Sequence, residues 1–165
     1  MKKNTPSVQT DTFYHVYNRG INSEIIFKQG RNYNYFLSQY AKYIEPIADT
    51  FAYCLMSNHF HLLVQTKTEE EILAYFSRRG IKTPKTAEFH ISNQFAKLFN
   101  SYTQSINRAV GRTGSLFEEP FRRVEVTNDS YYSHLIAYIH QNPQHHGFVN
   151  DFRDYPYSSI TVCWM

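Results

Sequence analysis

Residues 50–66, which read TFAYCLMSNHFHLLVQT, predict a β-hairpin. Two runs rich in β-branched and aromatic residues, 50–56 and 59–66, are separated only by Ser57 and Asn58. Runs of this composition are typical of strands, and a two-residue connection containing Asn favours a tight turn between antiparallel strands. We therefore expect two neighbouring antiparallel strands in the middle of the chain.

The segments before this hairpin show one extended and one helical pattern. Residues 12–19 are dense in β-branched and aromatic types and end at Gly20, which predicts a first strand. Large apolar residues then recur at helical spacing over 33–44, before Pro46. Because proline ends a helix that approaches it, this pattern predicts a helix between the first two strands.

The segments after the hairpin predict three main elements. Their signals are an apolar stripe at helical spacing, a short alternating run, and a capping residue ahead of a third helical pattern. They are a helix over 95–110 that ends at Gly111, a strand over 122–126, and a helix that Asp129 or Ser130 caps, that runs to about Gln141 and that Pro143 closes.

This order of elements predicts an α+β fold. Strand, helix, strand, strand, helix, strand is the order of a ferredoxin-like split βαβ sandwich with an antiparallel sheet, here with an extra C-terminal helix. We expect one domain over residues 1–165, in which 67–87 is an insertion or a loop. Its basic part, residues 78–85, is either a solvated loop or an arm that contacts a nucleic-acid backbone.

Composition excludes several classes of protein. The 165 residues are 42% hydrophobic and 19% charged, which is enough to form a packed core. No apolar run approaches the roughly 18 residues that cross a membrane, and the polar N-terminus lacks the apolar region of a secretory signal. Cys54 and Cys163 are too few for a disulfide framework or a four-thiolate zinc site. We therefore expect a cytoplasmic protein without a membrane partner, and its net charge of +3 permits an acidic partner without requiring one.

His59 and His61 are the sharpest local signal. Side chains alternate along a strand, so the two imidazoles point the same way while Phe60 points into the opposite layer. Two imidazoles at this spacing can share a cation. On the residues alone, a surface pair or a pair of hydrogen-bonded core histidines is the commoner explanation of the pattern.

The third predicted helix carries a second candidate set. Tyr138 and Asn142 are four residues apart and so lie on one helical face, with His134 one turn earlier. The carboxamide oxygen of Asn142 is a suitable ligand for Mg²⁺ or Mn²⁺, and Tyr138 would then be a nucleophile beside that ion. In a chain with 14 tyrosines, however, a helical tyrosine is commonly a core or interface residue.

Four segments together resemble a known family. The segment MSNHFHLLV at 56–64 resembles the HUH motif, in which two histidines flank a bulky hydrophobic residue. The segments YIHQNP at 138–143, GRTGSLF at 111–117 and HVYNRG at 15–20 resemble the tyrosine helix, the glycine-rich loop and the first strand of small single-tyrosine HUH transposases. The resemblance covers roughly residues 12–160 and is to the REP-associated tyrosine transposases in particular.

The resemblance implies a role for each matched residue. His59, His61 and Asn142 would bind a divalent cation, Mg²⁺ or Mn²⁺, and Tyr138 would attack the phosphodiester. The family's reaction nicks single-stranded or hairpin DNA without ATP, and leaves a 5′-phosphotyrosine link and a free 3′-hydroxyl. A general base for Tyr138 is not identified, although His134 and His140 are candidates beside a purely structural role for both. The resemblance leaves monomer and homodimer open.

DNA contacts and departures from the family pattern complete the prediction. Tyr14 and Tyr17 are candidates for base stacking or for core packing. Phe117 stands where the family commonly has Trp, and residues 144–146, Gln-His-His, follow Asn-Pro where a basic residue is common. The arginines predicted to contact phosphates are Arg19, Arg112, Arg122 and Arg123.

Three functions are consistent with these observations. The first is a metal-dependent DNA strand-transfer enzyme, and the second is a domesticated relative that binds hairpin DNA without cleaving it. The third is a ferredoxin-like RNA-binding protein or a small metal hydrolase. Geometry separates the first from the third, because a Tyr138 far from His59 and His61 would exclude the strand-transfer mechanism.

Overall fold

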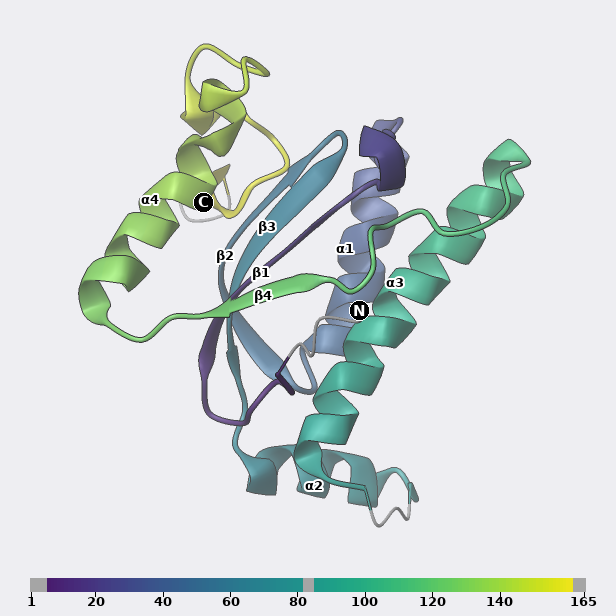
Figure 1. Ribbon diagram of the computed structural model, residues 1–165, viewed down its shortest axis with the longest axis vertical. Helices are drawn as coiled ribbons and strands as arrows, with labels where there is room; N and C mark the ends of the chain where they lie inside the picture. The colour runs from purple at the N-terminus through teal and green to yellow at the C-terminus, as the bar shows by residue number, and fades with distance from the viewer. Residues whose placement is uncertain (1–5, 82–84, 162–165) are drawn as a thin grey trace.

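The computed structural model describes residues 6–81 and 85–161 of the chain. Four strands and four α-helices make up most of it (Figure 1). Their bounds are β1 Phe13–Arg19, α1 Gly30–Ile44, β2 Ala48–Met56, β3 His59–Thr66, α2 Glu69–Arg78, α3 Ala87–Val110, β4 Arg122–Glu125 and α4 Asp129–His145, with 3₁₀ turns at Ile21–Ser23, Phe152–Asp154 and Ser159–Thr161.

The strands form one antiparallel sheet in the order β2-β3-β1-β4. This is the predicted split βαβ arrangement, in which α1 connects β1 to β2 and the α2–α3 segment connects β3 to β4. Met56 pairs with His59, so Ser57 and Asn58 form the two-residue turn of the expected hairpin. The predicted α+β fold class is therefore confirmed.

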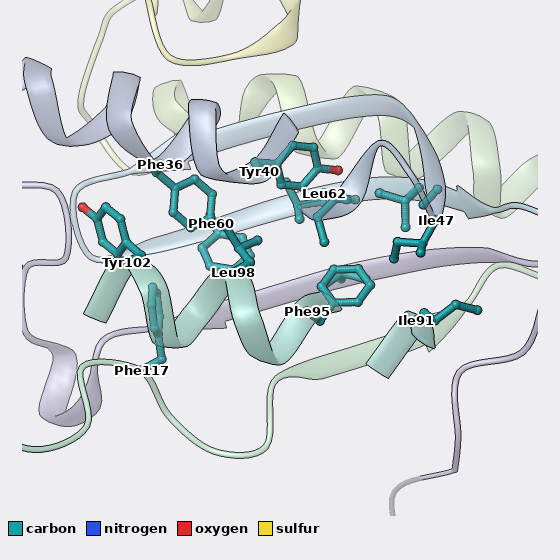
Figure 2. Close-up of a cluster of buried hydrophobic side chains, with 14 of the residues drawn as sticks. Phe36, Tyr40, Ile47, Phe60, Leu62, Ile91, Phe95, Leu98, Tyr102 and Phe117 are labelled. Carbon is teal, nitrogen blue, oxygen red and sulfur yellow. The ribbon is translucent and has the colours of Figure 1, made fainter. Parts of the chain in front are cut away.

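Each face of the sheet has its own apolar core. Helices α1 and α3 cover one face and α4 covers the other (Figure 1). The larger core lies under α1 and α3, where Phe36, Phe60, Phe95 and Tyr102 are fully buried (Figure 2). The smaller core joins α4 to the opposite face through residues such as Leu63 and Ile139. The alternation of side chains along β3 serves both cores at once.

The helix starts follow from local capping. The Thr68 hydroxyl accepts from the Glu71 amide while the Glu71 carboxylate accepts from the Thr68 amide, which starts α2. Thr86 caps α3 in a similar way by accepting from the Phe89 amide. Gly111, at φ 66°, adopts the left-handed conformation that ends α3, as predicted.

The predicted bounds of the third helix are wrong at both ends. Asn128 is the N-cap rather than Asp129 or Ser130, because its Oδ1 accepts from the Tyr131 amide at 2.8 Å. Pro143 lies inside α4 rather than ending it. Proline lacks its amide donor and its ring crowds the carbonyl one turn earlier, but the backbone after it still forms hydrogen bonds. The His146 amide donates to the Asn142 carbonyl at 3.0 Å, and the Phe148 amide donates to the Pro143 carbonyl at 2.9 Å.

The segment 67–87 is partly helical, since it contains α2 and the first residue of α3. Within its basic part, residues 82–84 lie outside the described residues, as does Cys163. Cys54 is buried beneath α4, and burial raises the pKa of its thiol to about 12. No helix in the described ranges is both long and apolar enough to cross a membrane.

Candidate functional site

The histidine pair lies at the start of β3, on the sheet face that α4 covers. The imidazole centroids of His59 and His61 are 5.5 Å apart, while Phe60 between them is fully buried in the opposite core. His61 pairs with Tyr17 on β1 and Cys54 on β2. The alternation of a strand therefore brings the two imidazoles to one face, as the sequence predicts.

Each imidazole is held through its Nδ1 atom. Nδ1 of His59 lies 2.7 Å from Oδ1 of Asn58, and Nδ1 of His61 lies 2.9 Å from Nε2 of His15. The Asn58 oxygen can only accept, so His59 donates from Nδ1 and keeps a lone pair on Nε2. Within residues 6–81 and 85–161, neither Nε2 atom has a hydrogen-bond partner. Metal-binding histidines are commonly held in this way, with one ring nitrogen anchored and the other free.

Burial keeps these rings neutral at physiological pH. It lowers the pKa of His15 and of His59 to about 4, and the neighbouring His146 and Arg19 add to the effect on His59. The pKa of His61 falls to about 3, through burial first and then through His15, His59 and His146. Neutral imidazole is the form that binds a metal ion.

Tyr138 reaches the same place from the opposite layer. It lies on α4 with 44% of its surface exposed, and its ring centroid is 5.4 Å from that of His61 and 6.3 Å from that of His15. Both ring pairs meet at 79°, so the tyrosine stands edge-to-face against the two imidazoles. The structure thus brings together Tyr138 and the histidine pair, which the strand-transfer mechanism requires.

Asn142 is one turn further along α4 and is only 1% exposed. Its Nδ2 donates to the carbonyl oxygen of Tyr138 at 3.5 Å, and it does not line the cleft around His59 and His61. In the part of the chain that the structure describes, no group of three or more His, Cys, Asp or Glu residues is arranged to hold a metal ion. The role of Asn142 as a third ligand remains a prediction.

An open cleft of about 650 Å³ lies in front of the histidines. Glu118 lies in it and accepts from Nε of Arg19 at 2.6 Å, with Arg122 3.9 Å away. The ring of His146 is 5.0 Å from that of His59, centroid to centroid. The lining residues are Tyr17, Asn18, Arg19, Ser23, Ser57, Asn58, His59, Phe60, His61, Glu118, Arg122, His146 and Phe148.

The four arginines predicted to bind DNA divide into two groups. Arg19 and Arg122 line the cleft, with 56% and 62% of their side-chain surface exposed. Arg112 bonds within the protein to Glu24 and to neighbouring loop atoms, and its side chain is only 18% exposed. Arg123 donates to the carbonyl oxygen of Pro6. Only the first group faces the space in which a ligand would lie.

The two histidines considered as a general base, His134 and His140, lie in different surroundings. His134 lines a second hollow, of about 380 Å³, with Tyr138, and its Nδ1 donates to the Ser130 carbonyl at 2.7 Å. His140 is buried against Ser159, which lies 2.8 Å from its Nε2, and so has a structural partner.

The two tyrosines of β1 divide in the same way. Tyr14 is packed in the larger core, whereas Tyr17 lines the cleft and remains available for stacking.

Sequence reasoning did not assign a role to His15, Glu118 or His146. His15 could have been found from strand alternation, because it shares a face of β1 with Tyr17 and so points toward α4. Glu118 lies in a loop and His146 lies at the end of α4, so no periodic sequence pattern places either residue near His59.

Fold and site together define a class of protein. It is an antiparallel α+β domain with a histidine pair on a central strand and, facing that pair, a tyrosine from the helix behind the sheet. These are the features by which the sequence resembles the single-tyrosine HUH proteins.

Comparisons with known proteins point to one branch of this class. No family model matches the chain. A REP-associated tyrosine transposase, as it is named, from Haemophilus influenzae is 28% identical over 128 residues, which are 77% of this chain and 68% of the relative. The structure of a REP-associated tyrosine transposase bound to a REP hairpin matches 98% of this chain and 84% of its own, with a TM-score of 0.63 and 17% identity. The resemblance to REP-associated tyrosine transposases that the motifs predict is confirmed.

Proposed function

We propose that the protein is a DNA strand-transfer enzyme that nicks single-stranded or hairpin DNA through a 5′-phosphotyrosine intermediate. The observation that supports this most directly is the contact of Tyr138 with His61, at 5.4 Å between ring centroids. The two residues come from elements far apart in the sequence and meet beside an open cleft. The structural neighbour is bound to a REP hairpin, which makes hairpin DNA the substrate class to test first.

The proposed reaction exchanges one phosphorus–oxygen bond for another. The Tyr138 oxygen attacks the scissile phosphorus, the bond to the 3′ oxygen breaks, and that oxygen leaves as a 3′-hydroxyl after taking up a proton. Attack by a 3′-hydroxyl on the phosphotyrosine reverses the step and rejoins the strand without ATP. His134 shares the hollow with Tyr138 and uses Nδ1 to donate to the Ser130 carbonyl, so its Nε2 is our candidate to accept the phenol proton.

The donor atoms present fit a divalent cation in part. Nε2 of His59 and of His61 are the atoms that would hold it, with Asn142 as the predicted third ligand. A bound Mg²⁺ or Mn²⁺ would polarise the scissile phosphate and stabilise charge on the departing oxygen. Arg19 and Arg122 line the same cleft and would contact the DNA phosphates on either side.

The test uses hairpin oligonucleotides with single-stranded flanks, incubated with Mn²⁺ and separated on a denaturing gel. A 5′-phosphotyrosine carries the downstream fragment, so a label at the 3′ end should move with the protein and a label at the 5′ end should not. Tyr138→Phe should abolish this adduct, because the phenol oxygen is lost. DNA binding should be retained, because Tyr138 is 44% exposed and the substitution should not disturb the fold. The matched control is Tyr131→Phe, a second α4 tyrosine in the same hollow, which should still form the adduct.

Two results would contradict the proposal. One is the absence of an adduct from the wild-type protein across a library of hairpins and divalent metals. The other is an adduct that survives Tyr138→Phe.

A second candidate function is hairpin DNA binding without cleavage. The observation in its favour is the position of Asn142, the predicted third ligand, which is 1% exposed and does not line the cleft in front of the histidines. Binding that persists in chelator, with no cleavage under any metal, would favour this function.

A further inference from the structure

His15 is the buried group that joins the two halves of the site. It lies on β1, only 8% exposed, and its Nε2 is 2.9 Å from Nδ1 of His61. Its ring lies edge to edge with that of His61, with the centroids 5.1 Å apart and the planes inclined by 26°, and it is 6.3 Å from the ring of Tyr138, centroid to centroid. Tyr17 packs on its other side, with centroids 4.7 Å apart.

The hydrogen bond between His15 and His61 has two possible directions, and only one is compatible with a cation site. If His15 donates, Nδ1 of His61 accepts, and neutral His61 then carries its proton on Nε2. That proton occupies the position that a cation would need. If His61 donates from Nδ1, its Nε2 keeps a lone pair that faces away from His15, and His15 carries its own proton on Nδ1.

We propose that His15 is a positioning residue that accepts the Nδ1 proton of His61 and thereby turns the Nε2 lone pair of His61 toward a divalent cation. The inference rests on the proposed function, since the cation site belongs to it. Asn58 performs the same task for His59 at 2.7 Å, where the acceptor is an amide oxygen and the direction is not in question. The two cation-binding histidines are therefore each oriented by a hydrogen bond to Nδ1, one from the hairpin turn and one from the neighbouring strand.

The position of His15 makes the arrangement rigid. β1 pairs with β3 along seven residues, so the backbone on both sides of the hydrogen bond is fixed by the sheet. His15 and His61 are both buried, and Tyr17 packs beside the His15 ring, so neither imidazole has much freedom to rotate. Loss of the acceptor should weaken cation binding about 10- to 100-fold, the range typical for partners that orient a ligand histidine.

The experiment compares two substitutions at His15 with one at a matched histidine. His15→Phe keeps an aromatic ring at position 15 but removes the nitrogen that accepts from His61. His15→Gln instead places an amide oxygen near the former Nε2 position. His140→Phe is the control, because His140 is also 8% exposed and hydrogen bonded, but its partner is Ser159 in the last 3₁₀ turn rather than His61. Mn²⁺ affinity is measured by calorimetry on the DNA-free protein, with thermal unfolding to verify folding.

We expect Mn²⁺ affinity to fall at least about tenfold in His15→Phe, and to be largely retained in His15→Gln and His140→Phe. A second measurement is independent of metal and of folding changes in a variant. Nitrogen-15 NMR of the metal-free wild type should show His61 protonated on Nδ1 and unprotonated on Nε2.

Three outcomes would overturn the inference: a folded His15→Phe protein that binds Mn²⁺ as tightly as wild type, a proton on Nε2 of His61, or a wild-type protein that binds no Mn²⁺. Failure of the proposed function has a different signature. There, Mn²⁺ binding and its dependence on position 15 are intact, but no DNA adduct forms.

Discussion

The four arginines differ in what their guanidinium groups already contact, and this decides what each can do for a ligand. Arg19 and Arg122 share one carboxylate, Glu118, at the rim of the cleft and remain more than half exposed. An exposed ion pair contributes little to folding, so these two groups can exchange Glu118 for a phosphate at small cost. Arg112 and Arg123 are bonded to protein atoms instead.

Replacement of Arg122 should therefore affect DNA binding and leave stability unchanged. Arg122→Ala is expected to weaken hairpin binding about equally across DNA sequences and to lower the slope of log affinity against log salt by about 1. Binding titrations at several salt concentrations measure this slope. The control is Lys42→Ala, on the exposed side of α1, away from the cleft. Equal salt slopes for Arg122→Ala and wild type would exclude Arg122 from the phosphate contacts.

At the level of single residues, only part of the candidate site could be predicted from the sequence. Strand alternation and a family motif both single out His59 and His61, and helical spacing and a family motif single out Tyr138. Glu118 and His146 were missed, because they reach the cleft through the tertiary path of a loop and a helix end. The guanidinium of Arg112 turns inward for the same kind of reason, since Glu24, its partner, lies on a distant part of the chain.

At the scale of elements, Arg112 makes several of the hydrogen bonds that hold the connection between α3 and β4 in place. Arg112 donates to Glu24 at 2.9 Å, to Asn107 at 3.0 Å, and to the carbonyl oxygens of Gly114 and Ser115 at 3.2 and 2.6 Å. The connection also bonds to the end of β1, because the Ile21 amide donates to the Leu116 carbonyl. Glu118, at the rim of the cleft, lies on this connection, a few residues after Ser115.

Arg112→Ala should reduce the free energy of unfolding by about 2 kcal/mol, because several charge-assisted hydrogen bonds are lost and their acceptors are left unpaired. Urea unfolding followed by circular dichroism measures the change. Arg122→Ala, whose side chain is exposed, serves as the comparison and should shift the midpoint little. If Arg112→Ala were as stable as wild type and bound DNA less tightly, Arg112 would be a phosphate contact, as the sequence predicts.

The elements themselves were predictable because short-range signals mark them. The β2–β3 hairpin follows from its two-residue turn, and the end of α3 follows from Gly111. The end of α4 did not follow from Pro143, because a proline near the end of a helix is tolerated when later amides find other acceptors. Local rules therefore located the elements but not their last turns.

For the whole molecule, the sheet is apolar on one face and mixed on the other. Under α1 and α3 the core is continuous, whereas under α4 an apolar cluster around Leu63 and Ile139 gives way to His15, His61 and Tyr138. The imidazoles of His15, His59 and His61 lie near one another and are largely buried, so protonating them destabilises the fold. The architecture that holds the site thus carries a cost at low pH.

The metal-free protein should therefore lose stability as pH falls from about 6.5 towards 4. The unfolded chain protonates its histidines near 6.5, but the folded pKa values of His15 and His59 are about 4 and that of His61 is about 3. The unfolded state binds more protons over this window, so the free energy of unfolding decreases by at most about 1.4 kcal/mol per pH unit for each ring. Urea unfolding in chelator at pH 7.0, 6.0 and 5.0 measures the slope.

His15→Phe removes one of these rings and should give a shallower slope than wild type, whatever its stability at pH 7. Parallel pH profiles for the two proteins would show that His15 takes up its proton as readily in the folded state as in the unfolded one.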